Sequence, residues 1–452
     1  MTKSSKSLWA RFLFQDRGIL PSRKFLIIYL LLSVALLLLS LTDISWVFLI
    51  SVNVLFILVS FFDLFFLPKR SEIQAIRRVT DEMERGLCYQ MEIEFKNTSP
   101  YPCTFRIIDD LPQSFQQNFP IHGAAEANSR SRMTYETTAT VRGKYELQKL
   151  YIRYAGKFGL WEKQMAVEQS DTVKVIPDLS ETRRYLENAQ SFLLYEGAKI
   201  RKSRSGAGEF SRIRNYVVGD DPRKINWRQT AKLQEVMTNE YEPEHGKYIT
   251  ILIDCGRMMG AELKKGNRLE KTLEASITVA AAALKNGDYV GVLAFSNDIK
   301  VFIPPAKGMD QLQRILQGIY NLQADAKESN YTGVMSYLQT VQKKRSLILL
   351  FSDIHTFLHE ESTLHYVKRL RQKHLFLMIG IEDEALRKET KQQPETVQLA
   401  MRKSIAQQQL QVKRLEKAKW EARGLVMIEA KEERLATEAV SQVIHWMNLG
   451  LL

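Results

Sequence analysis

Two long apolar runs near the N-terminus constrain this chain more than any other feature. Residues 25–41 read FLIIYLLLSVALLLLSL and residues 44–67 read ISWVFLISVNVLFILVSFFDLFFL, almost without charge. About 20 apolar helical residues are needed to cross the hydrocarbon core of a bilayer. Only Thr42 and Asp43 separate the two runs, so the two helices must be antiparallel. We therefore expect a transmembrane helical hairpin over residues 25–67, embedded in the lipid bilayer.

Basic residues flank the hairpin and are absent between its two helices. They are Lys3, Lys6, Arg11, Arg17, Arg23 and Lys24 before the first run, and Lys69, Arg70, Arg77 and Arg78 after the second. By the positive-inside rule, this distribution places both ends of the chain in the cytoplasm. The sequence thus predicts a multi-pass protein of the cell (inner) membrane, with residues 1–24 as a basic cytoplasmic N-terminus. A cleaved signal peptide fits less well, because the first run lacks an Ala-x-Ala site and a second apolar run follows it.

In residues 72–180 apolar side chains recur with the two-residue period that is typical of β-strands. Residues 91–96 alternate apolar and charged side chains, which is typical of a half-buried strand. Similar strand patterns follow at residues 103–108, 133–141, 145–154 and 172–176, with Gly and Pro between them. A β-sandwich-like domain is expected here.

Residues 246–452 alternate apolar strand patterns with amphipathic helix patterns. Strands are expected at residues 248–254, 289–296, 300–303, 346–353, 374–380 and 425–429, and helices at residues 269–285, 310–322 and 431–448. This alternation predicts a doubly wound α/β domain, with a parallel sheet and helices on both of its faces. Residues 382–423 are charged and Gln-rich, and we expect them to form an exposed helical excursion.

Residues 181–245 contain a strongly basic stretch. Between residues 199 and 235 there are ten Lys or Arg residues and four acidic ones. Gly219 and Asp220 predict a turn, after which Asp221 should cap a short helix that has Pro222 in its first position and ends near Lys232. Ile225 and Trp227 would anchor this helix, while Arg223, Lys224 and Arg228 project from it.

Three partners would suit such a basic surface: an acidic protein surface, anionic lipid headgroups or nucleic acid. Nucleic acid is the least favoured of the three. Trp227 and Tyr216 are too few to form a stacking platform, and we expect them to be buried.

Two segments of the chain resemble a known family. GEFSRIRNYVVGDDPRKINWRQTAK at residues 208–232 resembles the signature of the bacterial DUF58 family, and RGKYELQKLYIRYAGKFGLW at residues 142–161 resembles its upstream β-rich segment. The matching signature positions are Arg214, Gly219, Asp220, Asp221, Pro222, Arg223, Trp227 and Arg228. The resemblance implies two N-terminal spans, a β-rich domain, a C-terminal domain of the von Willebrand factor A type and a MoxR-type AAA+ ATPase as partner.

The resemblance also implies a degenerate metal site in the C-terminal domain. An intact domain of this type binds Mg²⁺ through Asp-x-Ser-x-Ser together with a Thr and an Asp from later loops. Here Asp254 is kept, but Gly256 and Met258 replace the two hydroxyl residues, while Thr332 and Asp353 match the later ligands. Mg²⁺ prefers oxygen ligands, so we expect this edge to bind a partner protein rather than a metal and expect no cofactor.

The leading hypothesis from the sequence is a membrane-anchored, non-enzymatic adaptor that engages a MoxR-type ATPase in envelope or membrane-protein processes. The chain has no Gly-x-x-x-x-Gly-Lys-Ser/Thr loop, so ATPase activity would have to come from the partner. One alternative is an enzyme with hydrolase-like chemistry, centred on the carboxylates Asp220, Asp221, Asp254 and Asp353. The other is a module that binds anionic lipid or another anion.

Overall fold

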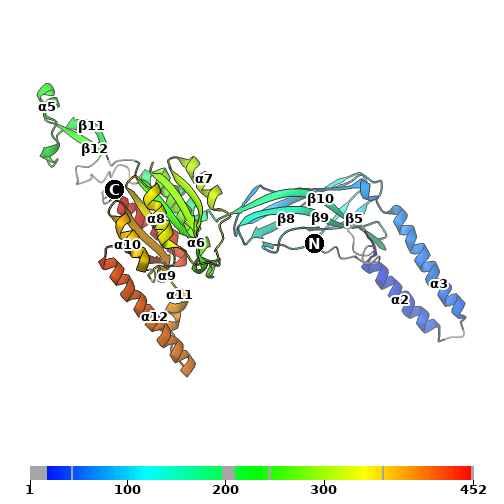
Figure 1. Cartoon of the computed structure of the whole chain (residues 1–452). Helices are drawn as coiled ribbons and strands as arrows, with labels where there is room; N and C mark the ends of the chain where they lie inside the picture. Colours follow the sequence, from blue (N-terminus) through cyan, green and yellow to red (C-terminus); the bar gives the residue numbers. More distant parts are fainter. Residues whose placement is uncertain (1–17, 42–43, 196–208, 243–245, 359–360, 449–452) are drawn as a thin grey trace. The chain divides into compact units, whose positions relative to one another are not determined.

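The computed structural model describes residues 18–41, 44–195, 209–242, 246–358 and 361–448 (Figure 1). The chain divides into two compact units, Met1–Ile176 and Pro177–Leu452. The division falls close to residue 180, where the sequence patterns change from strands to alternating helices and strands.

Two apolar helices lie near the start of the described part of the first unit. They are α2 (Arg23–Leu39), whose N-cap is Ser22, and α3 (Trp46–Ser60), which continues into the 3-10 turns η1 (Phe61–Phe66) and η2 (Arg70–Glu72). Most of their apolar side chains are exposed. Among the described residues, Trp46–Glu72 is the one helical stretch long and apolar enough to cross a membrane, since α2 has only 17 residues. The structure therefore supports one span by length and composition, and the expected two-span hairpin is not established by it.

Asp63 joins the end of the apolar helices to the β-structure. Its side chain is buried, and its Oδ2 accepts hydrogen bonds from the backbone N–H groups of Leu160 (2.8 Å) and Trp161 (3.0 Å). The Trp161 ring also packs on Phe25 of α2 and on Phe61, with centroids 5.3 and 5.0 Å apart. The base of both apolar helices is thus bound to one end of the sheet.

Among the described residues of the first unit, ten strands form two sheets. The strands are β1 (Ile19–Pro21), β2 (Ile73–Arg78), β3 (Glu82–Glu84), β4 (Cys88–Asn97), β5 (Cys103–Asp109), β6 (Phe115–Gln116), β7 (Ile121–Ala125), β8 (Arg130–Ala139), β9 (Gly143–Ala155) and β10 (Trp161–Ile176). One sheet has the order β1-β10-β9-β5-β7, with β3 also paired to β10, and the other has the order β2-β4-β8-β6. Phe95 of the second sheet stacks on Phe105 of the first at 3.7 Å between centroids, within one shared core. This is the sandwich-like arrangement that the alternating pattern predicts.

A buried arginine lies inside this sandwich. The guanidinium of Arg77 forms an ion pair with Asp109, another with Asp171 (2.9 Å), and donates to the Leu147 carbonyl at 2.7 Å. Tyr135 donates to the second oxygen of Asp109 at 2.6 Å. Burial raises the pKa of Asp109, whereas the charge of Arg77 lowers it.

A six-stranded sheet forms the centre of the second unit. Its order is β15 (Ile299–Ala306), β14 (Tyr289–Phe295), β13 (Tyr248–Asp254), β16 (Ser346–Phe351), β17 (Leu375–Ile381) and β18 (Val426–Ala430). All neighbours are parallel except β14 and β15, which are antiparallel. The expectation of a wholly parallel sheet was therefore wrong at this edge. Only residues 296–298 connect β14 to β15, which is long enough for a hairpin but too short for a parallel crossover.

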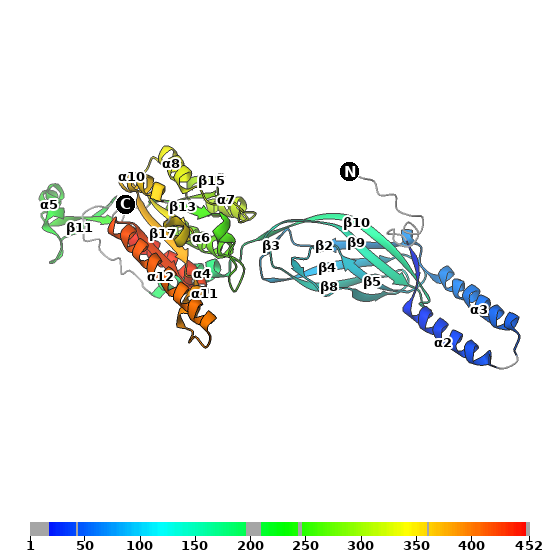
Figure 2. The same cartoon turned by 60° about the horizontal axis from the view of Figure 1, so that its bottom comes forward.

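Helices cover both faces of this sheet (Figure 2). Besides the short helix at residues 227–233, the described helices of the second unit are α4 (Ser180–Tyr195), α6 (Arg268–Lys285), α7 (Met309–Ile319), α8 (Tyr331–Val341), α9 (Ile354–Leu358), α10 (Glu361–Arg371), α11 (Glu384–Lys391), α12 (Val397–Ala422) and α13 (Leu435–Asn448), with 3-10 turns η4 (Arg257–Gly260) and η5 (Glu432–Arg434). On β13, Ile249 lies against α6 and α13, whereas Leu252 shares a core with α8, α9 and α10. Residues of opposite parity on one strand face opposite sides of a sheet, so both faces are covered.

The expected helical excursion at residues 382–423 is present as α11 and α12. Its last turn packs on the domain, because Trp420 is buried against Phe357 with ring centroids 5.1 Å apart. Val397, Met401 and Ile405 remain exposed along α12.

Candidate functional site

Asp254 lies at the carboxyl end of β13, and its carboxylate is fully hydrogen-bonded within the protein. Oδ2 accepts from the Tyr331 hydroxyl at 2.9 Å and from the Ser352 hydroxyl at 2.5 Å. Oδ1 accepts from the Gly256 N–H at 2.8 Å and from the Ser329 hydroxyl. The residue is only 2% exposed. Three hydroxyls and one amide thus surround this single carboxylate.

Gly256 makes room for one of those hydroxyls. A Cβ on Gly256 would lie 2.0 Å from the Ser329 Oγ, which no structure tolerates. The loop before α8 supplies this hydroxyl. Sequence reasoning missed Ser329, Tyr331 and Ser352. Ser352 could have been found, because it directly follows β16, the parallel neighbour of β13, and parallel strands end at the same edge.

Asp353 has a different set of partners from Asp254. It forms an ion pair with Arg268, which the sequence analysis did not single out. Its Oδ2 accepts from the N–H and the hydroxyl of Thr356 at 3.0 and 2.9 Å, and so caps the start of α9. Arg268 also lies 3.6 Å from Asp383.

Thr332 and Met258 do not complete a metal site with Asp254. The Thr332 hydroxyl lies 3.3 Å from the hydroxyl of Thr363, and Met258 is part of η4. No cluster of three or more His, Cys, Asp or Glu residues suited to a metal ion is found within the described ranges. Both oxygens of Asp254 already accept internal donors, and the Arg268 guanidinium neutralises Asp353. Because Mg²⁺ needs several accessible oxygen ligands, the residues present here do not fit that ion.

Burial dominates the electrostatics of this site. It raises the pKa of the Asp254 carboxyl, while the hydrogen bonds from Ser329 and Ser352 act in the opposite direction. Burial and the nearby Asp254 charge also raise the pKa of Tyr331 well above its ordinary value. A carboxylate that receives four hydrogen bonds in a closed site holds the loops at this sheet edge together. It does not offer a free base.

The signature segment forms a separate β-hairpin with an inserted helix (Figure 1). Strands β11 (Glu209–Asn215) and β12 (Met237–Glu242) pair antiparallel, and the connection between them contains the 3-10 turn η3 (Pro222–Lys224) and the helix α5 (Trp227–Leu233). The two terminal guanidinium nitrogens of Arg214 bind the two carboxylate oxygens of Asp220, at 2.8 and 2.9 Å. Asp220 also accepts from the Val217 N–H at 3.1 Å. Gly219 has φ +109°, a conformation that favours glycine.

Asp221 is a cap, as expected, but the helix it begins is shorter than predicted. Its side chain accepts from the Arg223 N–H at 3.0 Å and caps η3. Ile225 then adopts an extended conformation and interrupts the helix. Asn226 caps the second piece, α5, through the Gln229 N–H. The single predicted helix is therefore two pieces, because a second capping residue lies inside it.

The hairpin carries exposed apolar side chains beside its cations. Trp227 is 69% exposed and Val218 is 97% exposed, and Leu233 is exposed as well. The expectation that Trp227 anchors the helix in a core was therefore wrong. Arg223 and Arg228 are also exposed, as expected. We call this set of exposed hairpin side chains, Val218, Arg223, Trp227, Arg228 and Leu233, the hairpin patch.

The four carboxylates of the enzymatic alternative do not gather into one site. Asp220 pairs with Arg214 and Asp221 caps η3, both on the hairpin. Asp254 and Asp353 lie at the sheet edge, each with its own partners. Asp254 and Asp353 accept hydrogen bonds from hydroxyl groups, but both carboxylates are buried and these hydrogen bonds are internal to the protein.

Comparisons with known proteins give a partial picture. A family model described as "Protein of unknown function DUF58" matches residues 212–423. The "Uncharacterized protein YeaD" of Bacillus subtilis (strain 168) is 24% identical over 271 residues, which is 58% of this chain and 65% of that protein. The match thus spans slightly less than two thirds of this relative.

Two solved structures show weak likenesses. The conserved hypothetical protein BatB from Bacteroides thetaiotaomicron is 13% identical, and the alignment covers 45% of this chain and 98% of that one with a TM-score of 0.31. The PapD-like domain 7 of human CEP192 is 11% identical, with coverage of 24% and 90% and a TM-score of 0.19. Scores this low do not establish a shared fold.

Proposed function

We propose that this chain is a membrane-anchored, non-enzymatic adaptor that presents its α/β unit and its basic hairpin to a cytoplasmic AAA+ ATPase of the MoxR type. In this proposal α2 and α3 both enter the bilayer as a hairpin, and both ends of the chain are cytoplasmic. The α/β unit is of the von Willebrand factor A type with its metal site lost. The partner and this domain type come from the resemblance of the signature segment to DUF58 proteins.

The hairpin patch is the observation that carries this proposal. An exposed Trp together with other exposed apolar side chains is typical of a protein-binding surface. Such groups contribute most to the free energy of binding when a partner covers them. The cations beside it favour a partner surface with negative charge. The hairpin is held in shape by its own contacts, the bidentate Arg214–Asp220 pair and the two caps, so it can present the patch without help from the sheet.

The sheet edge supports the adaptor more than the enzyme. Its carboxylates are used in internal hydrogen bonds and ion pairs, which is what a rigid docking surface requires. Arg257 is an exposed residue at this edge and pairs only at the surface, with Glu328 at 3.0 Å. It is a suitable position for testing the edge without opening the Asp254 site.

The test is a crosslink and pull-down from membranes of the native cell, through a tag on the full chain, with the recovered proteins identified by mass spectrometry. Trp227→Asp tests the hairpin patch and Arg257→Glu tests the sheet edge. Val397→Asp is the matched control, because it places the same charge on another exposed apolar residue, on α12. We expect the wild type and Val397→Asp to recover an AAA+ ATPase and Trp227→Asp to lose it.

Recovery of no ATPase by the wild type, with the chain intact in the membrane, would overturn the proposed partner. Equal recovery by the wild type and Trp227→Asp would remove the hairpin patch as its docking site. Loss with Arg257→Glu alone would move the docking site to the sheet edge.

A further inference from the structure

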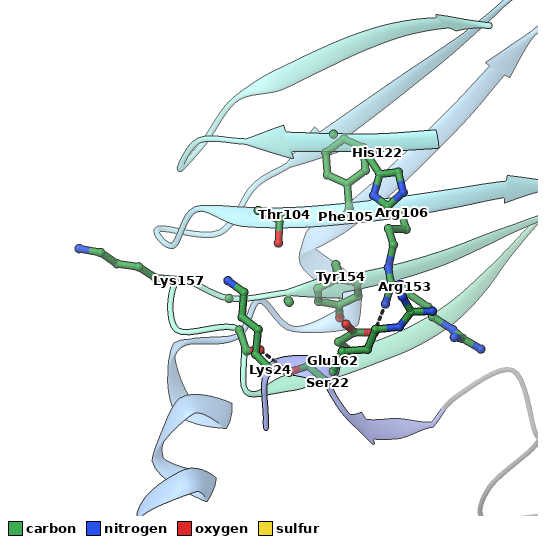
Figure 3. A pocket seen from close by; sticks show the side chains of 15 residues that line it. Ser22, Lys24, Thr104, Phe105, Arg106, His122, Arg153, Tyr154, Lys157 and Glu162 are labelled. Carbon is green, nitrogen blue, oxygen red and sulfur yellow. Dashed lines mark hydrogen bonds and ion pairs between the residues drawn. The ribbon is translucent and has the colours of Figure 1, made fainter. Parts of the chain in front are cut away.

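A cavity of about 560 Å³ lies at the base of α2 in the first unit (Figure 3). Its lining is strongly basic. Five cationic side chains and one carboxylate contribute to it: Arg23, Lys24, Arg106, Arg153, Lys157 and Glu162. Figure 3 shows Arg106 and Arg153 together at one side of the cavity and Lys24 at the other. Nothing in the proposed adaptor role uses this cavity.

Its floor is a row of basic side chains across three neighbouring strands, with an arginine on two of them. Arg106 on β5 is directly opposite His122 on β7 and directly opposite Arg153 on β9. These residues point away from the core, because Phe105 and Ile107 on either side of Arg106 are buried in it. Like charges directly opposite each other on adjacent strands are destabilising. This row therefore needs an anion.

The protein supplies only part of the negative charge that would balance this row. Glu162 forms an ion pair with Arg106. Arg153 donates its Nε to the neutral side chain of Gln164 at 3.0 Å. Within the described part of the chain, no carboxylate pairs with Arg23, Lys24, Arg153 or Lys157. The cavity thus keeps an excess of positive charge.

The cavity adjoins the first turn of the apolar helix. Ser22, which caps α2, lines it, and the Ser22 hydroxyl donates to the Gly159 carbonyl at 2.5 Å. Beyond Lys24 the helix is apolar to its end, with Leu30 and Leu31 exposed. If α2 enters the bilayer, as the proposed function states, this cavity lies at the depth of the lipid headgroups.

Aromatic side chains lie near the cavity, at the base of the apolar helices, where the proposed anchoring places the lipid headgroups. Trp161 packs on Phe25 and Phe61 beside the cavity, and Phe158 is exposed next to Lys157. Trp and Tyr are enriched at membrane–water interfaces, and other exposed aromatic rings can also lie in this layer. Cations and aromatic rings together are the groups expected around a headgroup.

We propose that this cavity binds the phosphate of an anionic membrane phospholipid. Arginine guanidinium groups bind phosphate in a bidentate way, and Arg106 and Arg153 are placed as neighbours to do so. The volume falls in the range of small-molecule sites, about 300–1,000 Å³, and is large enough for a headgroup rather than a phosphate ion alone. The inference rests on the membrane anchoring in the proposed function, but not on the ATPase partner.

The experiment uses the full chain reconstituted in nanodiscs of phosphatidylcholine with a minor fraction of cardiolipin. The protein is released into an uncharged detergent, and retained lipid is identified by native mass spectrometry. The test variant is Arg106→Gln/Arg153→Gln. The matched control is Arg130→Gln/Arg132→Gln, which removes two arginines from β8 in the other sheet. A charge-preserving variant, Arg106→Lys/Arg153→Lys, gives a second reading should the glutamine variant fail to fold.

We expect the wild type and the β8 control to retain cardiolipin, and the glutamine variant to bind it at least about tenfold more weakly. The lysine variant should retain it at an intermediate level, because lysine keeps the charge but loses the bidentate geometry. Cardiolipin should raise the thermal unfolding midpoint of the wild type but not that of the glutamine variant. Equal retention by the wild type and the glutamine variant would overturn the proposal, as would an equal loss in the β8 control.

Two further arms separate the sources of phosphate and the dependence on anchoring. If inorganic phosphate raises the unfolding midpoint of the wild type as much as cardiolipin does, the site takes a soluble anion and the lipid proposal is overturned. Alkaline extraction of native membranes tests the anchoring itself. A chain that resists extraction but retains no anionic lipid refutes the cavity proposal alone, whereas a chain that is extracted refutes the anchoring on which both rest.

Discussion

The Ser329 hydroxyl occupies the space that a side chain on Gly256 would need, 2.0 Å from the position of its Cβ. A side chain at position 256 and the present position of the Ser329 hydroxyl therefore exclude each other. Ser329 can donate to Asp254 only while position 256 is glycine.

This relationship predicts the outcome of placing a hydroxyl residue at position 256. Gly256→Ser should lower the free energy of unfolding by roughly 1–3 kcal/mol through overpacking. Adding Ser329→Ala should recover part of the loss, because the Cβ of residue 329 lies 3.2 Å from the new Cβ and can be accommodated by a small shift. Urea denaturation of the purified full chain measures both. A Gly256→Ser protein as stable as the wild type would contradict the geometry.

The same site predicts the response to divalent metal. Calorimetry of the wild type with millimolar Mg²⁺ should show no binding heat, since both Asp254 oxygens have internal donors and Arg268 neutralises Asp353. Gly256→Ser/Met258→Ser/Ser329→Ala introduces a hydroxyl residue at positions 256 and 258 and is the comparison. A saturable Mg²⁺ isotherm from the wild type would show that the internal hydrogen bonds give way to a metal.

Arg77 and Asp109 predict a stability effect in the sandwich. Arg77→Met should lower the free energy of unfolding by about 3–5 kcal/mol, because it leaves the Asp109 charge buried without its partner. Arg77→Met/Asp109→Asn should be more stable than the single variant, since an amide oxygen still accepts from Tyr135 without a charge. Denaturant midpoints of the two variants decide this. A double variant less stable than Arg77→Met would mean that the unpaired charge of Asp109 is not what destabilises the single variant.

His374 predicts how stability changes with pH. Burial lowers the pKa of its imidazole below the ordinary value of 6.5, and its Nδ1 lies 3.0 Å from the Ser346 hydroxyl. The unfolded state therefore takes up a proton at a higher pH than the folded state does. Stability should be fully retained above pH 6.5 and fall as the pH drops from there toward the folded pKa. Thermal midpoints measured across that range should fall more steeply for the wild type than for His374→Asn, and identical slopes would exclude the effect.

The two signature carboxylates should differ in importance. Asp221→Ala removes only a cap and should cost about 1 kcal/mol. Asp220→Ala leaves Arg214 without its bidentate partner and the Val217 N–H without its acceptor, so the hairpin should loosen further. Hydrogen exchange of β11 and β12 amides in the full chain reports this directly. Equal protection in the two variants would show that the Arg214–Asp220 pair does not hold the hairpin.

The sequence predicted the elements whose patterns are strong and local. The strands β13, β16 and β17 are continuous apolar runs, and β4 alternates over its length, so their periods were visible. Asp221 was identified as a cap because the turn chemistry around it is local. The antiparallel pairing of β15 was not predicted, because pairing direction depends on the length of a connection rather than on the pattern of the strand.

The candidate site was less accessible to sequence reasoning. Asp254 and Asp353 were identified through the family resemblance, but the hydroxyls that complete the Asp254 site include those of Ser329 and Tyr331, which are distant in the chain. The basic row beneath the cavity was missed for the same reason. Arg106 and Arg153 become neighbours only through the pairing of β5 with β9.

Strand β10 gives the first unit one continuous element of known length. It starts at Trp161, where Asp63 binds its first amide, and runs 16 residues to Ile176, directly before the second unit begins. At about 3.3 Å per residue, this strand spans about 50 Å. It is hydrogen-bonded to β9 along most of that length, so it resists bending and stretching far better than a flexible linker would. Within the first unit, the strand therefore connects the base of the apolar helices at Trp161 with the last residue of that unit, Ile176, through continuous paired backbone rather than through a loop.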